Sequence, residues 1–120
     1  MSGLVHRMGL YKEYFNSIRN GMKKVEVRLN DEKRRKINIG DFIEFVDVNN
    51  PAEKLRVKVT RLRKYKNFKD MYSDIPLADF DCKDWSMQEV IDGTYEIYTK
   101  EQEREWGTLA INIENNSSKE

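Results

Sequence analysis

The stretch from Gly21 to Asp31 constrains the fold of this chain more than any other. It begins with a glycine, which can end a helix in the left-handed conformation, and continues as an alternation of apolar and charged residues. Successive side chains of a strand point to opposite faces, so Val25, Val27 and Leu29 share one face. A strand of this kind is half-buried, and its charged face lies towards water or a cleft. We therefore expect the floor of any functional site at this strand.

The second face of that strand carries Lys24, Glu26 and Arg28. Charges on the outer face of a strand are usually solvated, and pairs between exposed charges stabilise a fold little. The alternation by itself therefore favours a solvated face, and a functional site needs further support from the rest of the sequence.

The composition limits the size of the fold and its partners. The chain has 120 residues, which suits one domain, and 36% of them are charged, so the hydrophobic core is modest. The net charge of +1 excludes a strong overall attraction to nucleic acid but allows a local basic patch. Apolar runs stay well below the roughly 20 residues of a membrane span, so we expect no membrane association.

Few residues are available for metal or disulfide chemistry. The single cysteine, Cys82, cannot form an internal disulfide, which favours a reducing, cytoplasmic location. One histidine and one cysteine leave little for a zinc site, and the sequence predicts neither a metal nor a cofactor. We expect structural roles for His6 and Cys82, and we expect Trp85 and Trp106 in the core rather than on a base-stacking surface.

Apolar periodicity predicts the helices. Residues 11, 14, 15 and 18 are Tyr, Tyr, Phe and Ile, the spacing of one helical face, and Asn20-Gly21 ends this helix. A further helix is expected from Asn67 to Tyr72. Capping-box patterns at Ser86–Glu89 and Thr99–Gln102 predict the starts of two more.

Alternating segments predict five strands. They are Leu4–Leu10, Lys24–Leu29, Phe42–Val48, Leu55–Leu62 and Thr108–Glu114. Strands and helices do not alternate regularly as they do in a parallel α/β protein. The expected class is therefore α+β, with a small and mostly antiparallel barrel or curled sheet. We expect a single domain over residues 1–114 and a disordered polar tail over residues 115–120.

The run from Gly21 to Arg28 resembles the signature of the ASCH domain family, G-x-K-x-x-E-x-R, which belongs to the PUA-like fold. The family also has a Gly-Asp turn before its next strand, which is found here at Gly40-Asp41. The run from Leu29 to Arg34 and the late Glu105-Trp-Gly107 resemble a bacterial, single-domain branch of the family. The similarity extends from about Val5 to Ile113, which is nearly the whole chain.

This resemblance implies a fold and a function. The fold is α+β, a PUA-like small mixed or antiparallel β-barrel with surrounding helices. ASCH domains are widely proposed to bind RNA in a cleft that carries the signature residues, which are Lys23, Glu26 and Arg28 here. The guanidinium of Arg28 suits a phosphate or a guanine edge, and Glu26 can accept from a base amino group. The leading hypothesis is a module that binds RNA, a nucleotide or a modified nucleoside.

The alternative hypothesis is a small amidohydrolase. One bacterial relative removes the acetyl group from N4-acetylcytidine, and its signature lysine helps to activate a threonine whose place Glu26 takes here. Lys23 and Glu26 are therefore the candidate catalytic residues, with Asp84 as a candidate acidic partner, although the nucleophile is missing. Strict alternation puts Lys23 on the side of Val25, so it meets Glu26 only if the strand begins after Lys23 or is locally twisted. A protein-interaction domain is a third hypothesis.

Two basic stretches are further candidates for ligand contact. Lys33, Arg34 and Arg35 lie at the end of a short turn, where they either contact phosphates or match the helix dipole on a solvated face. Lys64 and Tyr65 belong to a basic run that suits either a platform for single-stranded RNA or a charged edge strand. For both stretches the two interpretations stay open.

Overall fold

A five-stranded sheet organises the computed structural model, which describes residues 3–115. In chain order the elements are β1 (Val5–Leu10), α1 (Lys12–Arg19), β2 (Val25–Leu29), η1 (Arg34–Lys36), β3 (Phe42–Asp47), β4 (Asn50–Tyr65), α2 (Phe68–Asp74), η2 (Leu77–Phe80), α3 (Met87–Tyr95), α4 (Lys100–Trp106) and β5 (Thr108–Asn115). The two η elements are 3-10 helices.

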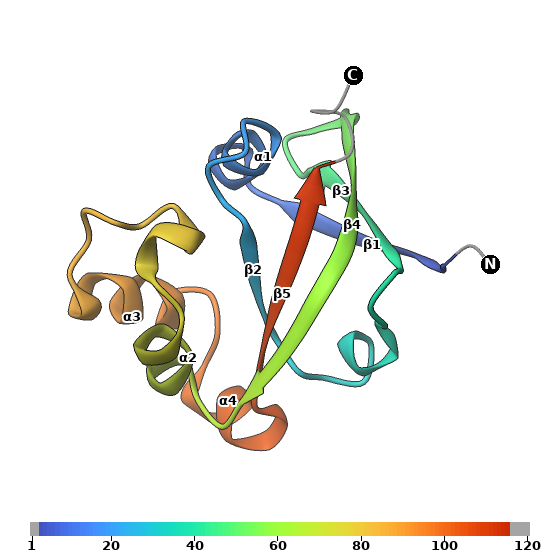
Figure 1. Ribbon diagram of the computed structural model, residues 1–120. Helices are drawn as coiled ribbons and strands as arrows, with labels where there is room; N and C mark the ends of the chain where they lie inside the picture. The colour runs from blue at the N-terminus through green and yellow to red at the C-terminus, as the bar shows by residue number, and fades with distance from the viewer. Residues whose placement is uncertain (1–2, 116–120) are drawn as a thin grey trace.

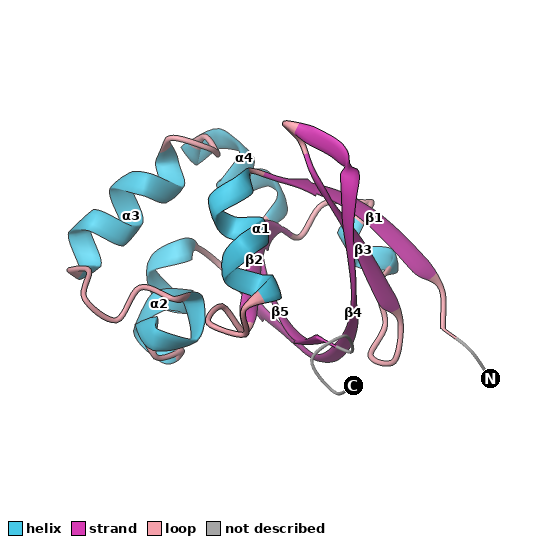
Figure 2. Cartoon of the chain, turned by 90° about the horizontal axis from the view of Figure 1, so that it is seen from above, coloured by secondary structure: helices cyan, strands magenta, loops and turns pink. Residues whose placement is uncertain are grey.

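The strands follow the order β1-β3-β4-β5-β2 across the sheet. β1 pairs with β3 in parallel, and the other neighbours are antiparallel. The sheet is curled into a half-barrel whose two edges are β1 and β2, which confirms the predicted α+β, PUA-like architecture. In Figure 1, α1 lies near the upper end of β2, and α2, α3 and α4 gather on one side of it. Figure 2 shows the same separation of these three helices from β1, β3 and β4.

Two hydrophobic clusters hold the fold together. The inner core lies inside the curled sheet and includes α1 through Phe15 and Ile18; its other buried members are Met8, Leu10, Ile37, Ile43, Phe45, Leu55, Val57, Val59, Leu109 and Ile111. The outer core lies between the sheet and the helices and consists of Val25, Leu29, Phe68, Met71, Tyr72, Ile75, Phe80, Val90 and Ala110. Because successive residues of β5 enter different cores, this strand joins the two.

The five predicted strands are present, and the bounds of β1, β2, β3 and β5 each differ from the prediction by one residue. β4 runs from Asn50 to Tyr65, longer at both ends than the predicted segment, because a tight turn at residues 48–49 joins it to β3 and its far end pairs with β5. β5 includes Asn115, which the sequence predicts in the tail. Residues 116–120 of the predicted tail lie outside the described residues.

Local capping signals place the helices correctly. Ser86 and Thr99 each begin a helix with both hydrogen bonds of a capping box, and the Asn67 side chain accepts from the Asp70 amide. Gly21 follows α1 with a φ of 78°, the left-handed conformation that the sequence predicts.

The prediction that Trp85 belongs to the core is wrong. This side chain is 50% exposed, because it precedes the Ser86 cap in a surface loop and lies against Gly93, which offers no side chain to cover it. Trp106 is partly buried and packs against the outer core, as predicted.

Candidate functional site

Three charged side chains of the signature meet in one cluster. The Lys23 Nζ lies 2.8 Å from Glu26 Oε1, and the Arg28 Nε donates to Glu26 Oε2 over 2.8 Å. The side chains are 10%, 3% and 12% exposed for Lys23, Glu26 and Arg28, respectively. We call these three residues the signature triad; it is a nearly buried ion-pair network and not the solvated face that the alternation alone favours.

The backbone explains how the signature triad forms. β2 begins at Val25, so Lys23 precedes the strand and its direction is not fixed by alternation. Glu26 and Arg28 lie opposite Ile111 and Leu109 in the pairing of β2 with β5, and both partners belong to the inner core. The triad therefore lies on the inner face of the sheet, at the β2 edge.

Arg28 also links the two edges of the half-barrel. Its Nη2 donates to the backbone oxygen of Gly9 in β1 over 2.9 Å. A side chain at position 9 would place its Cβ 2.8 Å from a methyl group of Val48, so only glycine fits there without a shift. β1 and β2 are the two edge strands and are not paired with each other in the sheet. The Arg28 side chain therefore joins these two edges at this point.

The electrostatics favour the charged form of the carboxylate. Burial alone raises the pKa of Glu26, but the charges and hydrogen bonds of Lys23 and Arg28 outweigh it and lower that pKa to about 2. Burial lowers the pKa of Arg28, and the Glu26 carboxylate reverses this effect, so the net shift is upward. At neutral pH the Glu26 carboxylate and the Arg28 guanidinium are charged.

Tyrosines and a thiol surround the signature triad. The Lys23 Nζ lies 4.8 Å from the centroid of the Tyr14 ring, a cation–π distance. Burial raises the pKa of Tyr98, whose phenol also feels the charges of Arg28 and Glu26. Burial likewise raises the pKa of the Cys82 thiol, and the charge of Lys23 opposes that rise only in part. The immediate surroundings of the triad are thus largely aromatic, and Asp31 is a further carboxylate whose charge acts on Arg28.

The basic residues after β2 are held by local contacts. Arg34 Nη1 lies 3.3 Å from Asp31 Oδ2, and the Asp31 side chain also accepts from the backbone amide of Arg34. Arg35 donates to the Asn30 backbone oxygen, and its guanidinium lies 5.4 Å from the Trp106 ring centroid. Lys33 is exposed and borders a shallow hollow beside Trp106, with a volume of about 340 Å³.

Other candidates lie away from the signature triad. Lys64 is in register with Arg28, but Leu109 lies between them, so two strand spacings, about 10 Å, separate the two backbones. The hydroxyl of Tyr65 donates to Asp74, which orients it towards α2. Asp84 is exposed in the loop before α3. The structure shows no contact between any of these three residues and the triad.

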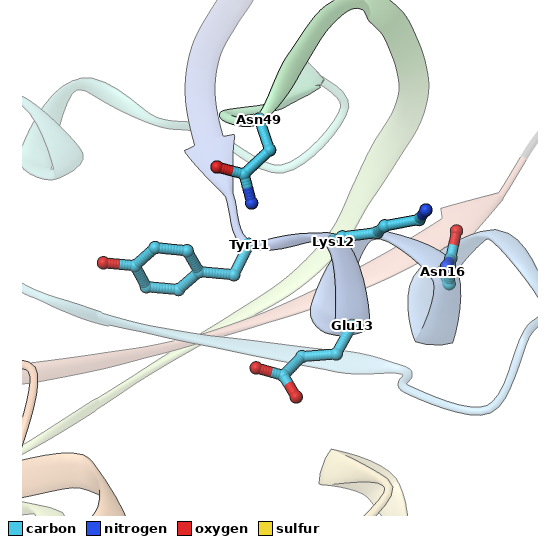
Figure 3. A pocket seen from close by; sticks show the side chains of 5 residues that line it. All are labelled: Tyr11, Lys12, Glu13, Asn16 and Asn49. Carbon is cyan, nitrogen blue, oxygen red and sulfur yellow. The ribbon is translucent and has the colours of Figure 1, made fainter.

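A second shallow hollow lies at the start of α1. It has a volume of about 430 Å³ and is bordered by Tyr11, Lys12, Glu13, Asn16 and Asn49, the side chains drawn in Figure 3. Neither hollow is lined by a residue of the signature triad. Within the triad, the side chains of Lys23 and Arg28 are more exposed than that of Glu26.

The described part of the chain supplies two further observations. Residues 3–115 contain no group of three His, Cys, Asp or Glu side chains placed to hold a metal ion. Among the same residues, no helix is long and apolar enough to cross a membrane. His6 is bound within the fold, because its Nε2 lies 2.8 Å from Asp41 Oδ2.

Sequence reasoning missed three neighbours of the signature triad: Gly9, Tyr14 and Tyr98. The helical spacing predicts Tyr14 on the apolar face of α1 and gives no sign that its ring also covers Lys23. Gly9 takes part through its backbone oxygen, a contact that residue types cannot reveal. Tyr98 lies far along the chain and is brought to Arg28 only by the packing of the helices.

These observations define a class of protein: a small α+β domain with a half-barrel sheet and a charged cluster where its two edge strands meet. The sequence matches the ASCH domain family over residues 8–117, which is most of its length, and the chain therefore belongs to that family. No protein of curated function matches the sequence.

Solved structures agree with this assignment. The chain is similar to the hypothetical protein PH0355, with 38% identity, a TM-score of 0.84, and coverage of 93% of this chain and 99% of that one. It is also similar to the protein PF0455 from Pyrococcus furiosus, with 34% identity, a TM-score of 0.75, and coverage of 94% and 98%. A mutant of ZmASCH from Zymomonas mobilis shares the fold at 11% identity, with a TM-score of 0.63 and coverage of 92% and 68%.

Proposed function

We propose that this ASCH domain is a binding module that recognises RNA, a nucleotide or a modified nucleoside at the signature triad. The observation that carries the proposal is that the Glu26 carboxylate forms two ion pairs: one oxygen pairs with Lys23 and the other with Arg28. Because both oxygens are occupied, Glu26 orients the two cations and is itself a weak candidate for direct contact with a base. The cations are the contact groups.

The remaining donors suit a phosphate or a base carbonyl. Arg28 uses Nε and Nη2 within the fold, which leaves Nη1 for a ligand, and the Lys23 ammonium retains protons beyond its bond to Glu26. Tyr14 and Tyr98 border the triad: the Lys23 ammonium lies against the Tyr14 ring, and the Tyr98 ring stacks on Phe68. The proposal therefore rests on the two preoriented cations, whose remaining donors suit the phosphate or a base carbonyl of a nucleotide.

The amidohydrolase alternative receives less support from the same contacts. Amide cleavage through a covalent intermediate needs a hydroxyl or thiol activated by a nearby base. The direct contacts of the Lys23 ammonium are the Glu26 carboxylate and the Tyr14 ring, and neither places a serine, threonine or cysteine nucleophile beside it. The Cys82 thiol has a raised pKa, which disfavours the thiolate.

The proposal is tested by isothermal titration calorimetry with the four ribonucleoside 5′-monophosphates. We expect at least one to bind, and we expect Arg28→Lys to weaken it by about tenfold, because lysine cannot both hold Glu26 and donate from a planar fork. Lys24→Ala, a change at the exposed neighbour before β2, is the matched control and should leave the affinity unchanged. Equal losses in the two variants, or no binding of any nucleotide, would overturn the proposal.

The enzyme alternative has its own test. Purified protein is incubated with N4-acetylcytidine, and the release of cytidine is followed by chromatography; we expect no turnover above background. Turnover that disappears in both Lys23→Ala and Glu26→Ala would replace the binding proposal. Two finer assignments remain proposals as well: a cytoplasmic location, supported by the single cysteine, and the bacterial branch, which the archaeal relative from Pyrococcus furiosus does not support.

A further inference from the structure

The outer face of β4 carries positive charge at every second residue. Lys54, Arg56 and Lys58 are exposed, while the intervening residues at positions 55, 57 and 59 are buried in the inner core. Side chains at alternate positions of a strand lie about 7 Å apart along one face. This part of β4 is therefore a straight line of three cations directed away from the barrel interior.

A β-bulge extends the line. Val59 lies opposite Ile113 and Arg61 lies opposite Asn112, so β4 has one extra residue between these pairs. Because alternation has a period of two, the extra residue moves Arg61 and Arg63 from the inner face to the outer face. The outer face of β4 thus carries five cations in one row, which we call the basic row: Lys54, Arg56, Lys58, Arg61 and Arg63.

Neighbouring strands leave the basic row with excess positive charge. Glu44 of β3 lies beside Arg56 and contacts it at 3.7 Å, but it also contacts Arg7 of β1 at 3.0 Å. Lys58 lies between Phe42 of β3 and Glu114 of β5 in the strand register. The same face of the sheet therefore has two carboxylates against six cations, with an aromatic ring beside the row.

Charge is also segregated over the whole molecule. Residues 66–107, which contain α2, α3 and α4, have five Lys and Arg against eleven Asp and Glu, a net charge of −6. The rest of the described chain has 16 Lys and Arg against nine Asp and Glu, a net charge of +7. The net charge of the whole chain is near zero because an acidic helical layer offsets a basic barrel. A polyanion is therefore attracted to the barrel and repelled from the helical layer.

From these observations we infer that the basic row binds the phosphate backbone of a single-stranded nucleic acid. A narrow line of cations matches a linear polyanion, and the spacing of alternate side chains is comparable to that of phosphates along an extended strand. A flat anionic membrane is matched by cations spread over an area rather than along one strand. The row lies on the outer face, whereas the signature triad lies on the inner face, so this inference goes beyond the proposed function.

The test measures fluorescence anisotropy of labelled oligouridylate and oligothymidylate over a range of salt concentrations. The row variant combines Lys54→Gln, Lys58→Gln and Arg61→Gln. The control variant combines Lys69→Gln, Lys83→Gln and Lys100→Gln, which are exposed in the helical layer and change the net charge equally. We expect the row variant to lose about tenfold in affinity and to lower the slope of log K against log salt by about 2, and the control to change neither.

Binding of both oligonucleotides supports recognition of the backbone, and stronger binding of oligouridylate supports RNA as its source. Equal losses in the two variants would show diffuse charge and overturn the inference. An absence of oligonucleotide binding would also overturn the inference. This includes the case in which the protein instead binds vesicles that contain phosphatidylserine, and the case in which it self-associates through its acidic layer. Mononucleotide affinity in the row variant, which we expect to be unchanged, separates failure of this inference from failure of the signature triad.

Discussion

At the scale of single residues, Glu26 has the most demanding environment in the site. It is 2% exposed and charged, and its two oxygens balance two cations that are nearly as buried as it is. Removing Glu26 leaves both cations without their counter-charge in a medium of low dielectric constant. The carboxylate is therefore as important for stability as for the orientation of Lys23 and Arg28.

We expect Glu26→Gln to lower the free energy of unfolding at neutral pH by about 3 kcal/mol, because two mostly buried cations lose their counter-charge. Urea unfolding followed by circular dichroism measures the change. Glu32→Gln, the same substitution at an exposed position, is the control and should change the free energy by less than about 0.5 kcal/mol. Similar small effects in both variants would mean that the triad contributes no more than a surface ion pair.

The same residue gives the protein a specific pH dependence. The pKa of Glu26 is lowered from 4.5 to about 2, so the folded state binds this proton less readily than the unfolded state. Its stabilisation is complete above pH 4.5 and is lost as the pH falls from 4.5 towards 2, by about 3 kcal/mol in total. The difference in unfolding free energy between wild type and Glu26→Gln should shrink over this window. A difference that stays constant would contradict the lowered pKa.

At the scale of elements, one buried carboxylate joins three helices. Glu103 of α4 accepts from the backbone amide of Phe68, the first residue of α2, over 2.8 Å, and from the hydroxyl of Tyr95 in α3 over 2.7 Å. The first amides of a helix have no partner within the helix, so Glu103 caps α2 from a distant part of the chain. The helical layer is therefore connected through one side chain as well as through its apolar core.

We expect Glu103→Ala to lower the free energy of unfolding by about 2 kcal/mol, because it leaves a buried amide and a tyrosine hydroxyl without their acceptor. Glu105→Ala on the same helix is the control, since Glu105 is exposed. Thermal unfolding by calorimetry compares the two. Burial and the Glu103 carboxylate also raise the pKa of Tyr95 to about 12, so an ultraviolet titration should show this pKa fall in Glu103→Ala.

Elements fixed by neighbouring residues were predictable from the sequence, and contacts between distant segments were not. The alternation of β2, the two capping boxes and the left-handed Gly21 depend on residues within a few positions of one another. The bond from Arg28 to Gly9 and the cap from Glu103 to α2 join segments that only the finished fold brings together. The meeting of Lys23 with Glu26 lies between these cases, since it required β2 to start at Val25.

At the scale of the whole molecule, β5 and β2 connect the two cores, because each strand has one face towards either core. Leu109 and Ile111 pack inside the barrel, whereas Ala110 between them packs against the helices. In β2, Val25 belongs to the outer core while Glu26 faces the inner side. Unfolding of either half exposes one face of strands that the other half needs, so the chain should unfold as one cooperative unit.

A destabilising substitution in one core should therefore also shift the unfolding transition of the other core. Ile43 of β3 is fully buried in the inner core, and Ile43→Ala should lower the free energy of unfolding by about 3 kcal/mol. Both tryptophans, Trp85 and Trp106, belong to the helical half, so their fluorescence reports on a region that Ile43 does not contact directly.

If the halves are coupled, the fluorescence transition and the circular dichroism transition of Ile43→Ala should shift together and give the same free energy. Ile39→Ala is the matched control: this side chain is 64% exposed, and its loss should cost less than about 0.5 kcal/mol. An unchanged fluorescence midpoint with an early loss of part of the circular dichroism signal would show a barrel and a helical layer that unfold separately. In that case the sharing of β5 between two cores would not make the domain cooperative.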